Sequence, residues 1–350
     1  MKKAHLISVS VFCLLIALPL TLFIRNGANA QNPQKPSVPA QASNYRLSGP
    51  YTHNNLTVFL VHGKDQTRKT FLTLQEALAQ KKVRVYETKD VNELAIRNLS
   101  NQDIYIQAGD IVRGGEQDRM ISMDFIVPPK SGRMPIAAFC VESGRWNKRG
   151  NEEAAVFSSS ENTVALREIK LAAKSSNSQQ AVWENVKVAQ EKLASNVGGS
   201  VQDAASASSL ELSVENPKVK ETTAAYINAL SGILKDKTDV IGYVFAINGH
   251  VNSADVYASH ALFAKLWPKL IKASSVEAVA ELQKGLEHKP VTDEIVMGFL
   301  TESEQVSAAT KDVTPRTRLV TRENEKNAFY ETQDRTDKDS FVHRNYIKKQ

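Results

Sequence analysis

The feature that most constrains the fold is a series of short runs of β-branched and aromatic residues in the first half of the chain. They recur at 56–61, 83–86, 94–96, 104–106, 121–127 and 136–141. Runs of this length between polar segments are typical of β-strands. Thr73-Leu74-Gln75-Glu76 has the capping-box pattern and predicts one short helix among the strands. The first half is therefore predicted to be mostly β.

Helical periodicity dominates the second half. Apolar residues recur at helical intervals in 182–193, 226–234 and 262–270, and Gly198-Gly199 gives the first helix an end. Pro268 is expected to kink or shorten its helix, and Ser274-Ser275-Val276-Glu277 has the pattern of another capping box. Strand-like runs remain at 240–247, 295–300, 318–320 and 329–330. The expected fold class is α+β: a mostly β N-terminal half with a short helix, then helices packed on the sheet and a C-terminal β hairpin.

The first thirty residues have the form of a secretory signal peptide. Lys2 and Lys3 precede a nearly continuous apolar run at 6–24, and Ala28-Asn29-Ala30 fits a cleavage site before Gln31. We therefore expect an exported protein, which is periplasmic, displayed at the cell surface or secreted. The alternative is an uncleaved N-terminal membrane anchor, because the apolar run approaches the length of a membrane span.

Composition shifts divide the rest of the chain. Residues 31–45 contain three prolines and predict an extended tether. Residues 46–310 are expected to form a single α+β domain with a Ser/Ala-rich internal loop at about 199–216. Residues 311–350 are expected to be a basic C-terminal extension. After removal of the signal peptide only Cys140 remains, so stability must come from the core and not from an internal disulfide.

The net charge of +6 is concentrated at the two ends of the chain. The first thirty residues carry three basic residues and no acidic one, and residues 311–350 carry ten basic and seven acidic residues. The intervening body is therefore neutral, and no nucleic-acid partner is expected.

Several common catalytic motifs are absent from the sequence. It contains no GxxxxGK[ST], GxGxxG, GxSxG or HExxH pattern. Its histidines have no close metal-ligand spacing, so no metal site is predicted and no cofactor is identified.

One segment concentrates polar chemistry: the run RGGEQDR at 113–119, between two predicted strands. A second group, ESGRW at 142–146, follows the strand expected at 136–141. If these strands pair, the two groups meet at one edge of the sheet. Arginine binds phosphate and carboxylate through two parallel hydrogen bonds, adjacent glycines permit an anion-binding backbone nest, and tryptophan stacks on rings. The candidate ligand-binding residues are Arg113, Gly114, Gly115, Gln117, Arg119, Arg145 and Trp146.

The acidic residues of the same two groups are candidate general acids or bases: Glu116, Asp118 and Glu142. Neighbouring arginines are expected to lower the pKa of these carboxyl groups, which favours binding or structural pairing over acid catalysis. Three interpretations stay open. The cluster binds an anionic small molecule, or a hydrolase uses Glu116 or Glu142 as general base, or the protein is an envelope interaction module whose ion pairs are purely structural.

The segments 113–119 and 140–146, with 57–78 and 242–270, resemble the ARG-and-rhodanese-phosphatase-superfamily-associated protein domain of bacteria, over about residues 56–280. The resemblance implies one domain with no established activity. The family name records an association with ADP-ribosylglycohydrolases, which implies a role around NAD-derived or ADP-ribosyl metabolites. A nucleotide- or ADP-ribose-like anion is therefore the expected ligand.

Overall fold

The computed structural model describes residues 41–163, 166–338 and 340–349. The expected signal peptide and residues 31–40 of the expected tether lie outside these ranges. The last residues of that tether form a short 3-10 helix, η1 (Gln41–Asn44). Helices and strands make up comparable shares of a mixed α+β fold, which confirms the predicted class.

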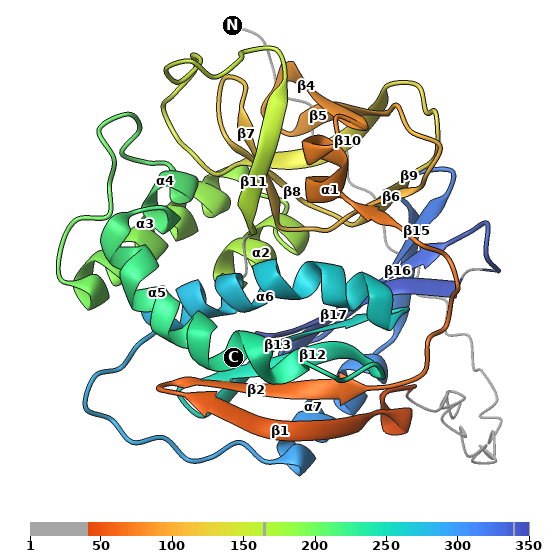
Figure 1. Ribbon diagram of the computed structural model, residues 1–350, viewed down its shortest axis with the longest axis vertical. Coiled ribbons are helices and arrows are strands. Elements are labelled where there is room, and N and C mark those ends of the chain that lie inside the picture. Colours follow the sequence, from red (N-terminus) through yellow and green to blue (C-terminus); the bar gives the residue numbers. More distant parts are fainter. Residues whose placement is uncertain (1–40, 164–165, 339, 350) are drawn as a thin grey trace, which may run out of the picture. The chain divides into compact units, whose positions relative to one another are not determined.

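The largest sheet is antiparallel and has eight strands, which come from the beginning, the middle and the end of the described chain (Figure 1). The segment expected to be a basic extension supplies much of this sheet, because its alternating apolar residues pack into the core. In spatial order the strands are β1 (Arg46–His53), β2 (Leu56–His62), β12 (Val240–Ile247), β13 (His250–Tyr257), β17 (Ser340–Lys348), β16 (Asn327–Asp334), β15 (Thr317–Glu323) and β14 (Ala308–Asp312).

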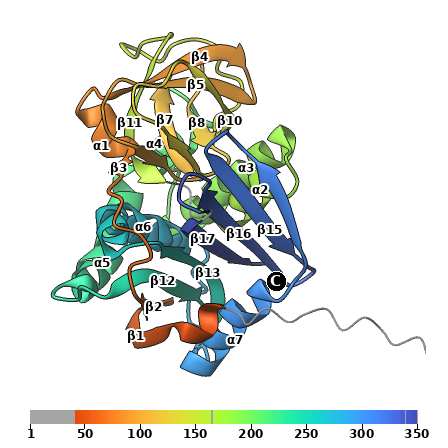
Figure 2. The same cartoon turned by 90° about the vertical axis from the view of Figure 1, so that its right-hand side faces the viewer.

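Residues 72–163 form a smaller β unit of two sheets (Figure 2). Its short helix α1 (Leu74–Ala79) begins with the predicted capping box: Thr73 accepts from the Glu76 amide, and the Glu76 side chain accepts from the Thr73 amide. One sheet has the order β11 (Phe157–Thr163), β7 (Asp110–Gly114), β8 (Arg119–Ile121), β10 (Met134–Cys140), β5 (Glu93–Asn98) and β4 (Val83–Asp90), and the other β3 (Leu72–Thr73), β6 (Ile104–Ile106) and β9 (Phe125–Val127).

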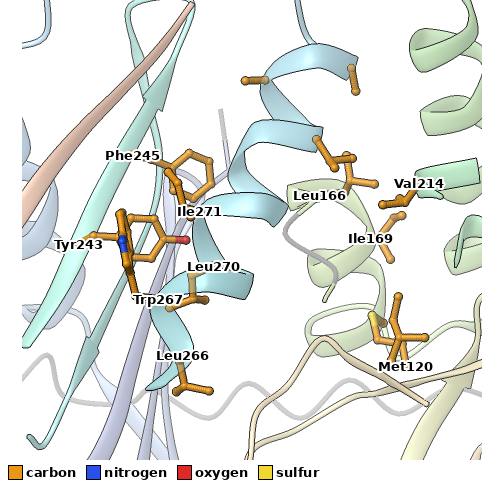
Figure 3. Close-up of a cluster of buried hydrophobic side chains, with 14 of the residues drawn as sticks. Met120, Leu166, Ile169, Val214, Tyr243, Phe245, Leu266, Trp267, Leu270 and Ile271 are labelled. Atoms are coloured by element: carbon orange, nitrogen blue, oxygen red, sulfur yellow. The ribbon is translucent and has the colours of Figure 1, made fainter. Parts of the chain in front are cut away.

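Helices cover both faces of the large sheet. α6 (His260–Ala280) packs on β12, where Tyr243 and Phe245 face Trp267 and Ile271 (Figure 3). In Figure 1, α4 (Leu210–Val214) lies beside the smaller β unit. The other helices on this side of the large sheet are α2 (Arg167–Lys174), α3 (Gln179–Val197), α5 (Pro217–Leu230) and η2 (Ser231–Leu234), and the opposite face of the sheet carries α7 (Asp293–Glu304).

Four local predictions were wrong. The run 121–127 is not one strand, because β8 ends at Ile121 and β9 begins at Phe125 in the other sheet of the smaller β unit. Residues 295–300 lie in α7 and not in a strand: Val296, Phe299 and Leu300 recur at helical spacing and are buried. The expected capping box at 274–277 lies inside α6, which runs through Pro268 because its flanking residues pack in the core. The end of the expected Ser/Ala-rich loop is helix α4.

No helix in the described ranges is both long enough and apolar enough to cross a membrane.

Candidate functional site

Pairing of β8 with β10 brings the two motif segments together. Arg119 lies opposite Cys140 in the antiparallel register. The residues before Arg119 and after Cys140 therefore meet at the same edge of the six-stranded sheet, as the sequence predicted.

Two buried arginine–carboxylate pairs form the centre of this edge. Arg145 donates from Nε to Oε1 and from Nη2 to Oε2 of Glu142, both at 2.7 Å. Arg149 donates from Nη1 to Asp118 Oδ2 at 2.9 Å and from Nη2 to Oδ1 at 3.1 Å. The Asp118 amide also donates to Glu142 Oε2 at 3.0 Å. Both pairs are thus bidentate, and a backbone hydrogen bond joins them.

A third buried pair extends the group. Arg119 Nη2 donates to Glu87 Oε1 at 3.2 Å, and its Nη1 contacts Cys140 Sγ at 2.6 Å. Burial raises the pKa of the Cys140 thiol to about 11 despite the nearby Arg119, so this thiol stays protonated at neutral pH. We name the six residues of these pairs the arginine–carboxylate cluster: Glu87, Asp118, Arg119, Glu142, Arg145 and Arg149.

The two central carboxyl groups respond differently to their surroundings. Burial raises the pKa of Glu142, but hydrogen bonds from Arg145 and Ser206 outweigh it and leave the pKa below its usual value. For Asp118, burial and the neighbouring Glu142 charge outweigh Arg149, so its pKa is raised. The expected lowering by nearby arginines thus holds for Glu142 and not for Asp118.

Other candidate residues are spread around the cluster. Arg113 is 27% exposed and donates to Glu215 at 3.1 Å. Glu116 is half-buried, and within the described chain no hydrogen-bond or ion-pair partner reaches its carboxylate. Trp146 is 47% exposed. Gln117 is buried and donates to a backbone carbonyl.

The two glycines of the motif shape the backbone of this edge. Gly114 and Gly115 have φ of 115° and 57°. A Cβ on Gly115 would lie 2.4 Å from the Phe157 ring and 2.7 Å from the Glu87 carboxylate. The Gly114 amide donates to Asp118 Oδ1 at 3.2 Å, so it already serves a protein carboxylate.

The Ser/Ala-rich segment closes over the cluster. Ser209 is fully buried and donates to Asp118 Oδ2 at 3.2 Å. Ser208 Oγ accepts from the Ser143 amide and donates to the Ser143 carbonyl. Hydrogen bonds of Ser208 and Ser209 therefore hold this segment in place over the cluster.

Sequence reasoning missed two members of the cluster, Glu87 and Arg149. Both lie outside the two motif segments, and neither has a motif of its own. The usable signal was the need of buried charges for partners: Arg119 directly precedes the apolar residues Met120 and Ile121, so a buried Arg119 required a carboxylate partner.

A second buried charge cluster was also missed, and we name it the His343 centre. His343 Nδ1 lies 2.6 Å from Asp124 Oδ2, and its Nε2 lies 3.0 Å from Asp255 Oδ1. Burial opposes the imidazolium, but the two carboxylates raise the pKa of His343. Lys170 and Lys174 line a cavity of about 10 Å³ beside it, and burial lowers the pKa of Lys174 to about 8. That cavity has room for about one water molecule.

Two larger clefts open on the large sheet. One, of about 650 Å³, lies between the turn after β1 and the loop 282–291. The other, which we name the His62 cleft, measures about 760 Å³, a size typical of small-molecule sites. Its lining includes Tyr45, Arg46, His62, Lys64, Asp239 and Phe341.

No set of three or more His, Cys, Asp or Glu side chains within residues 41–163, 166–338 and 340–349 is arranged to hold a metal ion.

Together, fold and site define an α+β domain with a buried arginine–carboxylate cluster at the edge of its smaller β unit. The chain belongs to the ARG and Rhodanese-Phosphatase-superfamily-associated Protein domain family, whose profile matches residues 44–347. The match includes β15 and β16 and nearly all of β17. Comparisons with curated proteins and with solved structures gave no match.

Proposed function

We propose that the protein is an exported binding module that holds an anionic small molecule in the His62 cleft. The arginine–carboxylate cluster stabilises the smaller β unit and does not touch this ligand. Export is supported by the basic, apolar N-terminal segment with its Ala-Asn-Ala site.

The observation that carries this proposal is the environment of Lys64. Its side chain is exposed in the cleft, and no carboxylate of the described residues forms an ion pair with it. Arg46 adds a second cation that is 66% exposed and shares Asp239 with His62. Tyr45 and Phe341 add aromatic rings to the lining. A phosphate or carboxylate here meets cations that still have free donors.

The arginine–carboxylate cluster offers no comparable donors. Arg119 and Arg145 are at most 10% exposed, and each already faces a carboxylate. An anionic ligand would have to displace a buried bidentate partner, which costs several kcal/mol. The pairing therefore supports a structural role of the paired motif residues over their ligand-binding roles and over a general-base role of Glu142.

Calorimetric titration of the full chain with ADP-ribose, AMP and glucose 6-phosphate tests the proposal. We expect at least one of them to bind and Lys64→Gln to weaken that binding about tenfold or more, as the loss of one charge-assisted hydrogen bond predicts. Lys187→Gln is the matched control, because Lys187 is an exposed lysine on α3. The proposal fails if none of the three anions binds, or if both variants bind like the unaltered protein.

A further inference from the structure

A serine of β1, a histidine of β2 and the aspartate just before β12 lie in a row beside the His62 cleft. His62 and Asp239 line that cleft, and Ser48 lies next to His62 outside the lining. In the β1–β2 register Arg46 lies opposite His62, and Ser48 is two residues further along β1 on the same face. In the β12–β2 register Val240 lies opposite His62. Asp239, the residue before Val240, is therefore next to His62 on the side away from β1.

The side chains are connected in the order required for nucleophile activation. His62 Nε2 lies 2.7 Å from Ser48 Oγ, and His62 Nδ1 lies 2.9 Å from Asp239 Oδ1. His62 is only 7% exposed, so its ring is held in place. Ser48 is half-buried and is the last paired residue of β1 before a β-bulge.

The charge state of Asp239 fixes the direction of these hydrogen bonds. The hydrogen bond from His62 lowers the pKa of Asp239, which is therefore ionised and only accepts. The His62 proton must then lie on Nδ1, and in the neutral ring Nε2 accepts the hydroxyl proton of Ser48. This is the tautomer that a general base beside a serine nucleophile needs.

We propose that Ser48, His62 and Asp239 form a nucleophilic site that hydrolyses carboxylic esters at the border of the His62 cleft. Ser48 is the nucleophile, His62 the general base and acid, and Asp239 the positioning residue. The inference rests on the proposed function only in assigning the anionic group of the natural ester to Lys64 and Arg46.

The reaction needs water as its one co-reactant. Ser48 Oγ bonds to the ester carbonyl carbon as its proton passes to His62 Nε2. The bond from that carbon to the alcohol oxygen then breaks, and the alcohol leaves with the proton. Water next gives a proton to His62 and adds its oxygen to the acyl carbon. The bond to Ser48 breaks, Ser48 recovers the proton, and a carboxylic acid is released.

Esters fit this site better than amides. The Asp239 side chain is 54% exposed and also paired with Arg46, so solvent screens its support for a positively charged His62. When the bond to the leaving group breaks, His62 must donate a proton to it. An amide nitrogen depends on this proton more than the oxygen of an activated ester does.

The test uses the full chain, p-nitrophenyl butyrate and a fluorophosphonate probe. We expect ester hydrolysis above the buffer rate and a covalent adduct on Ser48, located by peptide mass spectrometry. Ser48→Ala is expected to lower the hydrolysis rate at least a hundredfold and to abolish labelling. Asp239→Asn is expected to lower kcat while labelling stays at Ser48. Thr52→Ala, which removes another hydroxyl of β1, is the control and should leave the rate unchanged.

The direct adduct in the unaltered protein keeps the test independent of whether a variant folds. The proposal is overturned if no adduct forms on Ser48, if hydrolysis does not exceed the buffer rate, or if Ser48→Ala retains full activity. Because p-nitrophenyl butyrate is uncharged, its hydrolysis does not depend on anion binding. Binding of ADP-ribose, AMP or glucose 6-phosphate by Ser48→Ala without ester hydrolysis by the unaltered chain would overturn the esterase proposal alone.

Discussion

Glu116 and Glu142 belong to the same edge of the sheet and have opposite surroundings. The Glu142 carboxylate is completely buried and accepts hydrogen bonds from Arg145 and from the Asp118 amide. The Glu116 side chain is half-buried, with no partner in the part of the chain that the structure describes. A buried carboxylate with an arginine partner cannot lose its charge without leaving the arginine uncompensated.

Glu142→Gln should therefore lower the free energy of unfolding by about 3–5 kcal/mol, the range found when one partner of a buried pair is removed. Glu116→Gln, the matched control, should change it by no more than about 0.5 kcal/mol. Urea denaturation followed by circular dichroism measures both. Equal effects of the two substitutions would contradict a structural role for the cluster.

At the residue scale, the sequence predicted which segments meet but not how their charges are satisfied. The strand patterns at 121–127 and 136–141 were enough to bring Arg119 and Arg145 to one edge. Arg149 and Glu87 carry no local signal, because a buried ion pair is defined by position in space and not by spacing. The same holds for Ser48, His62 and Asp239, which come from three strands or strand ends far apart along the chain.

At the scale of elements, local chemistry predicted boundaries well where a cap or a glycine sets them. Thr73 begins α1 and Gly198 ends α3 in the left-handed conformation, both as expected. The predictions failed where a helix is buried on opposite faces, because its apolar residues then no longer show the helical periodicity. Residues 274–277 have a capping-box pattern but lie in the interior of α6, whose last two turns are almost entirely buried. The helix continues through them, so they do not form an N-terminal cap.

Close strand approach makes Gly242 of β12 a sensitive position. A Cβ there would lie 2.4 Å from the Asp255 carbonyl oxygen and 2.8 Å from the Val256 Cα, both on β13. Gly242→Ala should destabilise the protein by about 1–3 kcal/mol, because the backbone contact cannot relax by a rotamer change. Gly298→Ala in α7 meets nothing within 4 Å and should stabilise by about 0.5–1 kcal/mol. Thermal unfolding of both variants checks the sign, and two shifts in the same direction would contradict it.

At the scale of the whole domain, the His343 centre joins the two β units. Asp124 lies between β8 and β9 of the smaller unit, whereas His343 and Asp255 lie on neighbouring strands of the large sheet. Lys170 and Lys174 approach from α2, and the Tyr257 ring stacks on His343 at 4.5 Å. No sequence signal marked this centre, because His343 is 88 residues from Asp255 and 219 residues from Asp124.

The pKa shifts of the centre predict a pH-dependent stability. The pKa of His343 is raised above 6.5, so its contribution is complete below pH 6.5 and is lost as the pH rises through the raised value. The charge of His343 outweighs burial and lowers the pKa of Asp124 below 3.8, so that contribution is lost only in stronger acid. Lys174 contributes the opposite trend at high pH. Because its pKa is lowered in the folded protein, the free energy of unfolding rises as Lys174 loses its proton.

Urea unfolding of the unaltered chain and of His343→Asn across pH 4–9 tests this assignment. The difference in unfolding free energy should be largest between about pH 4 and 6.5 and should shrink toward about pH 9, because only the unaltered chain loses a charged imidazole. Lys174 is present in both proteins and adds its trend to both. A difference that is constant with pH would contradict the assignment.

The position of β17 has a consequence for how the large sheet is assembled. This strand lies inside the eight-stranded sheet and pairs with β13 on one side and with β16 on the other. Without β17, both of these strands would present an unpaired backbone edge. The two halves of the sheet therefore become one sheet only when β17 pairs between them.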